Sequence, residues 1–163
     1  GEDVSDQLLG LLASEHNEVR YQAPISLAEQ QVESAGAPLL SRLQEEGDAE
    51  IRCNLCAALG DLEYGPATDA LVKLSTDDPN QMVRFEAACA AGRMGDVRVA
   101  EHLAAVADHE VYGFTACSLL AELQEKNVLD TLRRSYRKWF LSAEHRGRPG
   151  RPRMRHGTPL SDQ

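Results

Sequence analysis

The chain has 163 residues, a length that suits one domain with a hydrophobic core. Hydrophobic residues make up 42% and aromatic residues only 5%, which argues against wholesale disorder and against a strand-rich fold. The net charge of −9 combines an acidic part, residues 1–132 with 24 acidic and 8 basic residues, and a basic part, residues 133–163 with 9 basic and 2 acidic residues. No apolar run approaches the roughly 18 residues of a membrane span, so we expect no membrane partner. The four cysteines lie among alanine and leucine residues and suggest buried thiols in a reducing compartment, so we expect a cytoplasmic protein.

A repeated pattern runs through most of the chain. Similar segments begin at Val19, Ile51 and Val83, which are equally spaced, and a fourth begins at Val111 after a slightly shorter interval. Each segment has mostly apolar residues at its first, fifth and ninth positions, with small residues beside them. This is the pattern of an amphipathic helix that packs closely against another helix.

A second amphipathic stretch precedes each of these segments, at residues 7–13, 38–43, 67–74 and 99–106. Polar residues, most of them suited to capping a helix, stand three positions before each repeated segment: His16, Asp48, Asn80 and Asp108. The sequence therefore predicts an all-α fold of four helix pairs, followed by a last helix over residues 127–141. Pro24 falls inside the first repeated segment, where we expect a late helix start or a kink.

The run Ile51-Arg52, followed by Ala58-Leu59-Gly60, resembles the second helix of a HEAT repeat. The short period is similar to the compact repeats of phycobilin-lyase-type proteins. The resemblance covers residues 5–125 and implies a right-handed α–α superhelix, a HEAT-like solenoid. It also implies a ladder in which Arg20, Arg52 and Arg84 each reach an acidic or carbonyl group of a neighbouring repeat. At the fourth repeat Tyr112 replaces the arginine.

Two patterns suggest metal or redox chemistry. Cys53 and Cys56 have the Cys-x-x-Cys spacing, but no second such pair completes a zinc site, so packing in the core is the favoured interpretation over a metal or redox role. His109-Glu110 is the only His-Glu dipeptide, whereas HEAT-like di-iron hydroxylases carry such pairs just after the Val-Arg of their repeats. We therefore predict no enzyme activity, no cofactor and no metal site. A chromophore-lyase-like subunit remains a minor alternative.

The second helices of HEAT-like stacks line a concave face, and this face is the predicted binding site. An apolar and aromatic strip suits an amphipathic or basic segment of a partner. The strip includes Ile25 and Ala57 and is flanked by Glu29, Asp61 and Glu86. The candidate partner-binding residues are Tyr21, Asn54, Phe85, Glu86 and Phe114. The alternative is that these side chains pack between repeats. The leading functional hypothesis is a protein-interaction scaffold, with a protein or peptide partner whose identity is unknown.

The basic end of the chain divides into two parts. Residues 126–141 have an aromatic face and a basic face, as in a capping helix that closes the core, although such a helix could also contact a membrane surface or an acidic partner. We therefore expect a solenoid domain over residues 1–143 and a flexible tail over residues 144–163.

Residues 146–149 of the tail match the Arg-Gly-Arg-Pro core of an AT-hook, which binds the minor groove of DNA. The candidate residues are Arg146, Arg148, Arg151, Arg153 and Arg155. Three interpretations stay open: a DNA- or RNA-associated accessory protein, a basic tail that is simply solvated or binds an acidic partner, and a tail that docks on the acidic body of the same chain.

Overall fold

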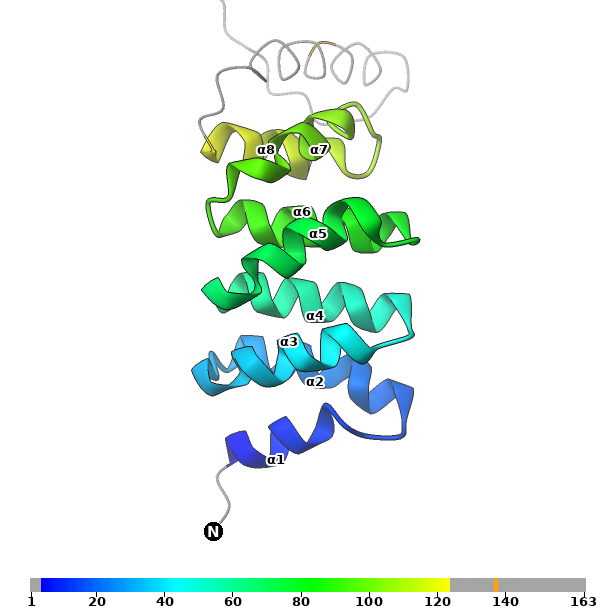
Figure 1. The fold of residues 1–163 in the computed structure, drawn as a ribbon, viewed down its shortest axis with the longest axis vertical. Coiled ribbons are helices and arrows are strands. Elements are labelled where there is room, and N and C mark those ends of the chain that lie inside the picture. The colour runs from blue at the N-terminus through cyan, green and yellow to red at the C-terminus, as the bar shows by residue number, and fades with distance from the viewer. Residues whose placement is uncertain (1–3, 124–136, 138–163) are drawn as a thin grey trace, which may run out of the picture.

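The computed structural model describes residues 4–123 and residue 137. The described part is a stack of helix pairs in two layers (Figure 1). The first layer contains α1 (Val4–Leu11), α3 (Gly36–Glu45), α5 (Thr68–Asp77) and α7 (Ala100–Ala105). The second layer contains α2 (Asn17–Glu29), α4 (Ala49–Asp61), α6 (Gln81–Arg93) and α8 (Gly113–Glu122). The predicted all-α solenoid of four helix pairs is confirmed, and the described residues contain no strand.

The period of the repeat is visible in every element from α2 to α6. Helices α2, α4 and α6 have the same length, and their first residues, Asn17, Ala49 and Gln81, are equally spaced along the chain. Each is followed by a 3-10 turn, η1 (Glu33–Ala35), η2 (Gly65–Ala67) or η3 (Val97–Val99), that leads into the next first-layer helix. The predicted helix at 127–141 and the tail at 144–163 lie outside the described residues, apart from Arg137, which is helical.

Side-chain caps fix the start of the two central second-layer helices. The carboxylate of Asp48 accepts hydrogen bonds from the backbone N–H groups of Glu50 (2.9 Å) and Ile51 (3.3 Å) at the start of α4. Asn80 does the same for α6. His16 provides no side-chain cap for α2, so the expectation of a cap there is wrong.

Pro24 lies inside α2 without delaying the start of the helix, which begins at Asn17. The expected late start is therefore wrong. Proline has no backbone N–H, so one hydrogen bond of the helix is missing at this point. The ring is among the fully buried side chains of the protein, and its burial offsets part of that cost.

The second-layer helices pack very closely on one another. Gly60 of α4 lies against Ala90 of α6, and a Cβ atom at position 60 would lie 2.8 Å from both the Cα and the Cβ of Ala90. One repeat further along, a Cβ atom at Gly92 of α6 would lie 3.9 Å from the Cβ of Leu119 in α8, which is an ordinary van der Waals contact. The small residues Gly60 and Ala90 therefore let α4 and α6 approach closely.

These contacts also show how the fourth repeat is aligned. Gly60 contacts Ala90 of the next repeat, and the equivalent Gly92 contacts Leu119, so Leu119 is the structural equivalent of Ala90. The sequence alignment of Val83 with Val111 instead pairs Ala90 with Ser118. The buried column of α8 therefore begins at Tyr112 and continues through Ala116 and Leu120, both fully buried. The sequence predicts Val111 as the first buried apolar position of the fourth repeat. This expectation is wrong, because Val111 is 71% exposed.

The shift has a local cause. Helix α7 has six residues, whereas α3 and α5 have ten each. The chain then makes a turn in which Nδ1 of His109 accepts hydrogen bonds from the N–H groups of Val111 (3.2 Å) and Tyr112 (3.5 Å). The N-cap position of α8 is Tyr112, so the expectation that Asp108 stands at that position is wrong.

Candidate partner-binding site

Phe85, one of the five residues expected to bind a partner, belongs to the core. The residue is only 5% exposed. The ring stacks on Tyr112 of the fourth repeat, with ring centroids 4.3 Å apart and an angle of 28° between the planes. The expectation that Phe85 lies on an open strip is therefore wrong, and its alternative, packing between repeats, describes this side chain.

The other four candidates remain at the surface to different degrees. Phe114 is 84% exposed and Tyr21 is 40% exposed, so both rings are accessible to another molecule. Asn54 and Glu86 are half-buried on α4 and α6. The amide of Asn54 donates a hydrogen bond of 3.1 Å to the backbone carbonyl of Tyr21, which ties α4 to α2.

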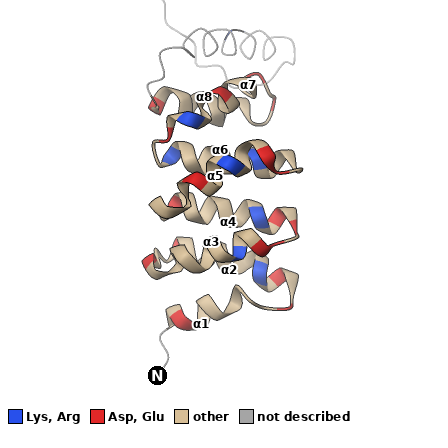
Figure 2. Cartoon of the chain, in the orientation of Figure 1, with Lys and Arg blue, Asp and Glu red and all other residues tan. Residues whose placement is uncertain are grey.

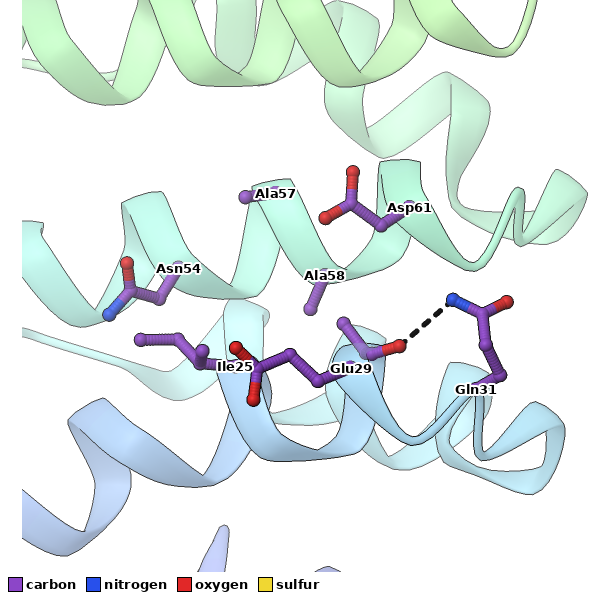
Figure 3. Close-up of a pocket in the computed structure, with 8 residues that line it drawn as sticks. Ile25, Glu29, Gln31, Asn54, Ala57, Ala58 and Asp61 are labelled. Atoms are coloured by element: carbon purple, nitrogen blue, oxygen red, sulfur yellow. Dashed lines mark hydrogen bonds between the residues drawn. The ribbon is translucent and has the colours of Figure 1, made fainter.

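A pocket of about 420 Å³ opens between α2 and α4 (Figure 3). Apolar side chains and polar side chains both line it: Ile25, Ala28, Ala57 and Ala58, together with Glu29, Gln31, Asn54 and Asp61. Sequence reasoning named most of these positions but not Ala28 or Gln31; Gln31 follows the end of α2. The amide of Gln31 donates a 2.9 Å hydrogen bond to the carbonyl of Ala28 at the pocket (Figure 3).

The charges at this face follow the repeat. The last-turn position of the second helices is Glu29 in α2, Asp61 in α4 and Arg93 in α6, each one repeat apart. Arg93 forms an ion pair with Asp61, with 3.4 Å between the Nη1 and Oδ1 atoms. Between α4 and α6 an acid thus meets a base, whereas between α2 and α4 the two corresponding side chains are both acids.

Glu86 adds a further carboxylate to the same face. Burial raises the pKa of Glu86 and the neighbouring Asp61 raises it too, while the positive charge of Arg93 opposes the shift. A carboxylate with a raised pKa is charged at a cost to the folded state, and a cation from a partner would reduce that cost.

Replacement of Glu86 by Gln should stabilise the protein at neutral pH. Because folding raises the pKa of Glu86, its contribution favours the folded state at low pH and is lost as the pH rises through the folded-state pKa. We expect E86Q to raise the melting temperature at pH 7 by about 1–2 °C, and to leave it unchanged near pH 3.5. Thermal melts of both proteins at the two pH values test this, and an equal gain at both would contradict the electrostatic cause.

Three arginines hold the loops that precede the second helices. Arg20 Nε donates to Glu46 Oε2 at 3.0 Å, and Arg52 donates to both oxygens of Asp78, at 2.9 and 3.1 Å. Arg84 donates to the backbone carbonyl of Asp78 at 2.7 Å, in the loop before its own helix. Figure 2 shows these basic segments near the starts of α2, α4 and α6, one above another. Arg20 and Arg52 join successive repeats and so help to fix the spacing of α2, α4 and α6. The hydrogen bonds of Arg84 stay within its own repeat, so the expectation that it reaches a neighbouring repeat is wrong.

The cysteines show no activation for metal or redox chemistry. All four are free, and Cys53, Cys56 and Cys89 are buried in the core. Burial raises the pKa of Cys53 to about 11 and that of Cys89 to about 12, and it raises the pKa of Cys56 as well, so the reactive thiolate is scarce at neutral pH. Within residues 4–123, no three His, Cys, Asp or Glu side chains gather as ligands for a metal ion.

The comparisons with known proteins agree with the repeat geometry. Residues 36–116, from the start of α3 into α8, match the family model described as HEAT repeats. The chain is a HEAT-repeat protein. HEAT repeats generally serve as protein-interaction scaffolds, and this repeat fold is typically non-catalytic. No curated protein matches the chain at a significant level.

Other expectations for this HEAT-repeat protein concern residues outside the described part. Arg146, Arg148, Arg151, Arg153 and Arg155, the candidate residues for nucleic acid or an acidic partner, all belong to the tail. In the part of the chain that the structure describes, no helix has both the length and the apolar character needed to cross a membrane.

Proposed function

We propose that this HEAT-repeat protein is a non-enzymatic scaffold that binds a basic segment of a protein partner on the face formed by α2, α4, α6 and α8. The observation that carries the proposal is the pocket between α2 and α4, where Ile25 and Ala57 provide an apolar floor and Glu29 and Asp61 provide negative charge. Peptide-binding grooves combine these features, since apolar anchors supply affinity and charges fix orientation.

The surrounding surface favours a basic partner over an acidic one. Residues 4–123 carry 20 acidic and 7 basic residues. The ladder occupies two of these basic residues, Arg20 and Arg52, in ion pairs with loop carboxylates. Close approach of an acidic segment or of a nucleic acid to this face would therefore be repulsive, whereas a cationic segment would be attracted over about 10 Å at moderate salt.

Replacement of Ala57 by Arg should abolish partner binding. Ala57 is half-buried in the pocket, so an arginine there fills the space and places a positive charge beside Asp61. We expect A57R to reduce by at least tenfold the amount of partner captured from cell extract of the source. The captured partner is then purified, and its affinity for wild type and variant is measured by calorimetry.

The matched control is the same substitution in the opposite layer. Ala37 is an exposed residue of α3, so A37R changes the net charge equally without changing the candidate site. Capture by A37R should equal that by wild type. If A57R and A37R capture the same proteins in the same amounts, the second-helix face is not the binding site.

A further inference from the structure

The gap between α2 and α4 differs from the gap between α4 and α6 in one respect that bears on binding. In the α4–α6 gap, Arg93 reaches back to Asp61 across adjacent helices. In the α2–α4 gap the equivalent residues are Asp61 and Glu29, and the pocket of about 420 Å³ lies beside them (Figure 3). The protein thus supplies a guanidinium group in one gap and leaves space and negative charge in the other.

We propose that the α2–α4 pocket is an arginine-binding site, and that its occupant is the arginine-rich segment 146–155 of the same chain. A guanidinium group can bridge the carboxylates of Glu29 and Asp61, because its planar donors reach two acceptors at once. The methylene stem of the arginine then lies on Ile25 and Ala57. Pockets that hold small molecules measure about 300–1,000 Å³, so the volume is sufficient for a side chain.

The composition of the segment suits this site. It contains five arginines separated by small residues, prolines and one methionine. Glycine has no side chain, so the glycines add little bulk beside an arginine that enters between two helices. Its positive charge is opposite to that of the face that it approaches.

The chain is also long enough to make this contact. The pocket lies two helix-to-helix steps from α8, and neighbouring helix axes are about 8–10 Å apart, so the distance to cover is about 20–30 Å. Residues 124–145 connect Leu123 to Arg146. Even at the helical rise of 1.5 Å per residue these residues span about 33 Å, and they span more when extended. A tethered segment that can reach its site acts at a high effective concentration.

This inference does not rest on the proposed function. A docked tail would compete with an external basic partner for the same pocket, which would make partner binding depend on release of the tail. Either proposal can fail alone, because one is tested by capture of another protein and the other by contact within a single chain.

The test is a photo-cross-linking experiment on the full chain. Gln31 is exposed and lines the pocket, so replacement by the photoreactive residue p-benzoylphenylalanine is expected to leave the fold intact, which circular dichroism checks. After irradiation and proteolysis, mass spectrometry should identify cross-links from position 31 to residues 146–155. The same probe at Ala37, in the opposite layer, should give at least tenfold fewer such links.

A charge variant tests the role of the two acids. Combining E29Q with D61N should reduce the cross-link to the tail at least tenfold, whereas E33Q with D69N, two exposed acids outside the pocket, should leave it unchanged. The experiment uses a mixture of isotopically heavy and light protein, so links within one chain differ in mass from links between chains. Links between chains, links to other residues, or no tail links at all would each overturn the proposal.

Discussion

Replacement of Glu46 by Ala is expected to reduce the free energy of unfolding by about 3 kcal/mol, close to the cost of breaking other buried ion pairs. The Glu46 side chain is only 2% exposed. Its carboxylate accepts hydrogen bonds from Arg20 (3.0 Å), from two nitrogens of Arg42 (3.0 and 2.7 Å) and from the backbone N–H of Asp48 (3.1 Å). Without it, two arginines on different helices lose their anion, and the loop before α4 loses its anchor.

The loss should depend on pH in a defined direction. Burial raises the pKa of Glu46, but hydrogen bonds from Arg20, Asp48 and Arg42 outweigh burial and lower the pKa from 4.5 to about 2. A group whose pKa is lowered by folding stabilises the protein above its unfolded pKa, and this stabilisation disappears as the pH falls through the folded pKa. The difference between wild type and E46A should therefore be largest above pH 5 and shrink steadily toward pH 2.

Chemical denaturation at pH 7 and pH 3 measures both effects. The adjacent Glu45 provides the control, because it is exposed and stands at the same end of α3. E45A should change stability by no more than about 0.5 kcal/mol, as exposed substitutions usually do. If E46A destabilises the protein no more than E45A does, the ion pairs of Glu46 contribute little to the free energy of unfolding, and the prediction is wrong.

The sequence predicts the repeated part of this fold well because the determinants are local. The regular period and the caps at Asp48 and Asn80 all act within one helix or one turn. The fourth repeat could not be predicted in the same way. Alignment on β-branched residues selects Val111, whereas the structure places the aromatic Tyr112 at that position, after a shortened α7.

The same misalignment explains the error at the candidate site. From the sequence, Phe85 is predicted to be an exposed aromatic residue because nothing indicates which residue covers it. In the structure its ring stacks on Tyr112, which belongs to the misaligned fourth repeat. The solvent exposure of a side chain on a second-layer helix depends on which residue of the next repeat packs against it. The sequence of a single repeat does not contain that information. Glu29 and Asp61 are visible in the sequence as a column, but only the packing of α2 on α4 brings a pocket beside them.

Replacement of Gly60 by Val should cost about 3 kcal/mol, at the upper end of the usual range for overpacking a core. A Cβ atom at this position would lie 2.8 Å from the Cα and from the Cβ of Ala90, and valine adds two further methyl groups. One of the colliding atoms belongs to the backbone of α6, so a change of side-chain rotamer cannot relieve the contact. Helices α4 and α6 must therefore move apart.

The control and a second substitution separate this steric effect from helix propensity. Gly10 in α1 has open space around its Cα, so G10V should be neutral or slightly stabilising, since valine forms helix somewhat better than glycine. Adding A90G to G60V should recover only part of the loss, because the Cα of residue 90 remains in place. Denaturation curves of the four proteins measure these differences. Full recovery in the double variant would mean that only the Ala90 methyl group, and not the approach of the two helix backbones, sets the spacing between α4 and α6.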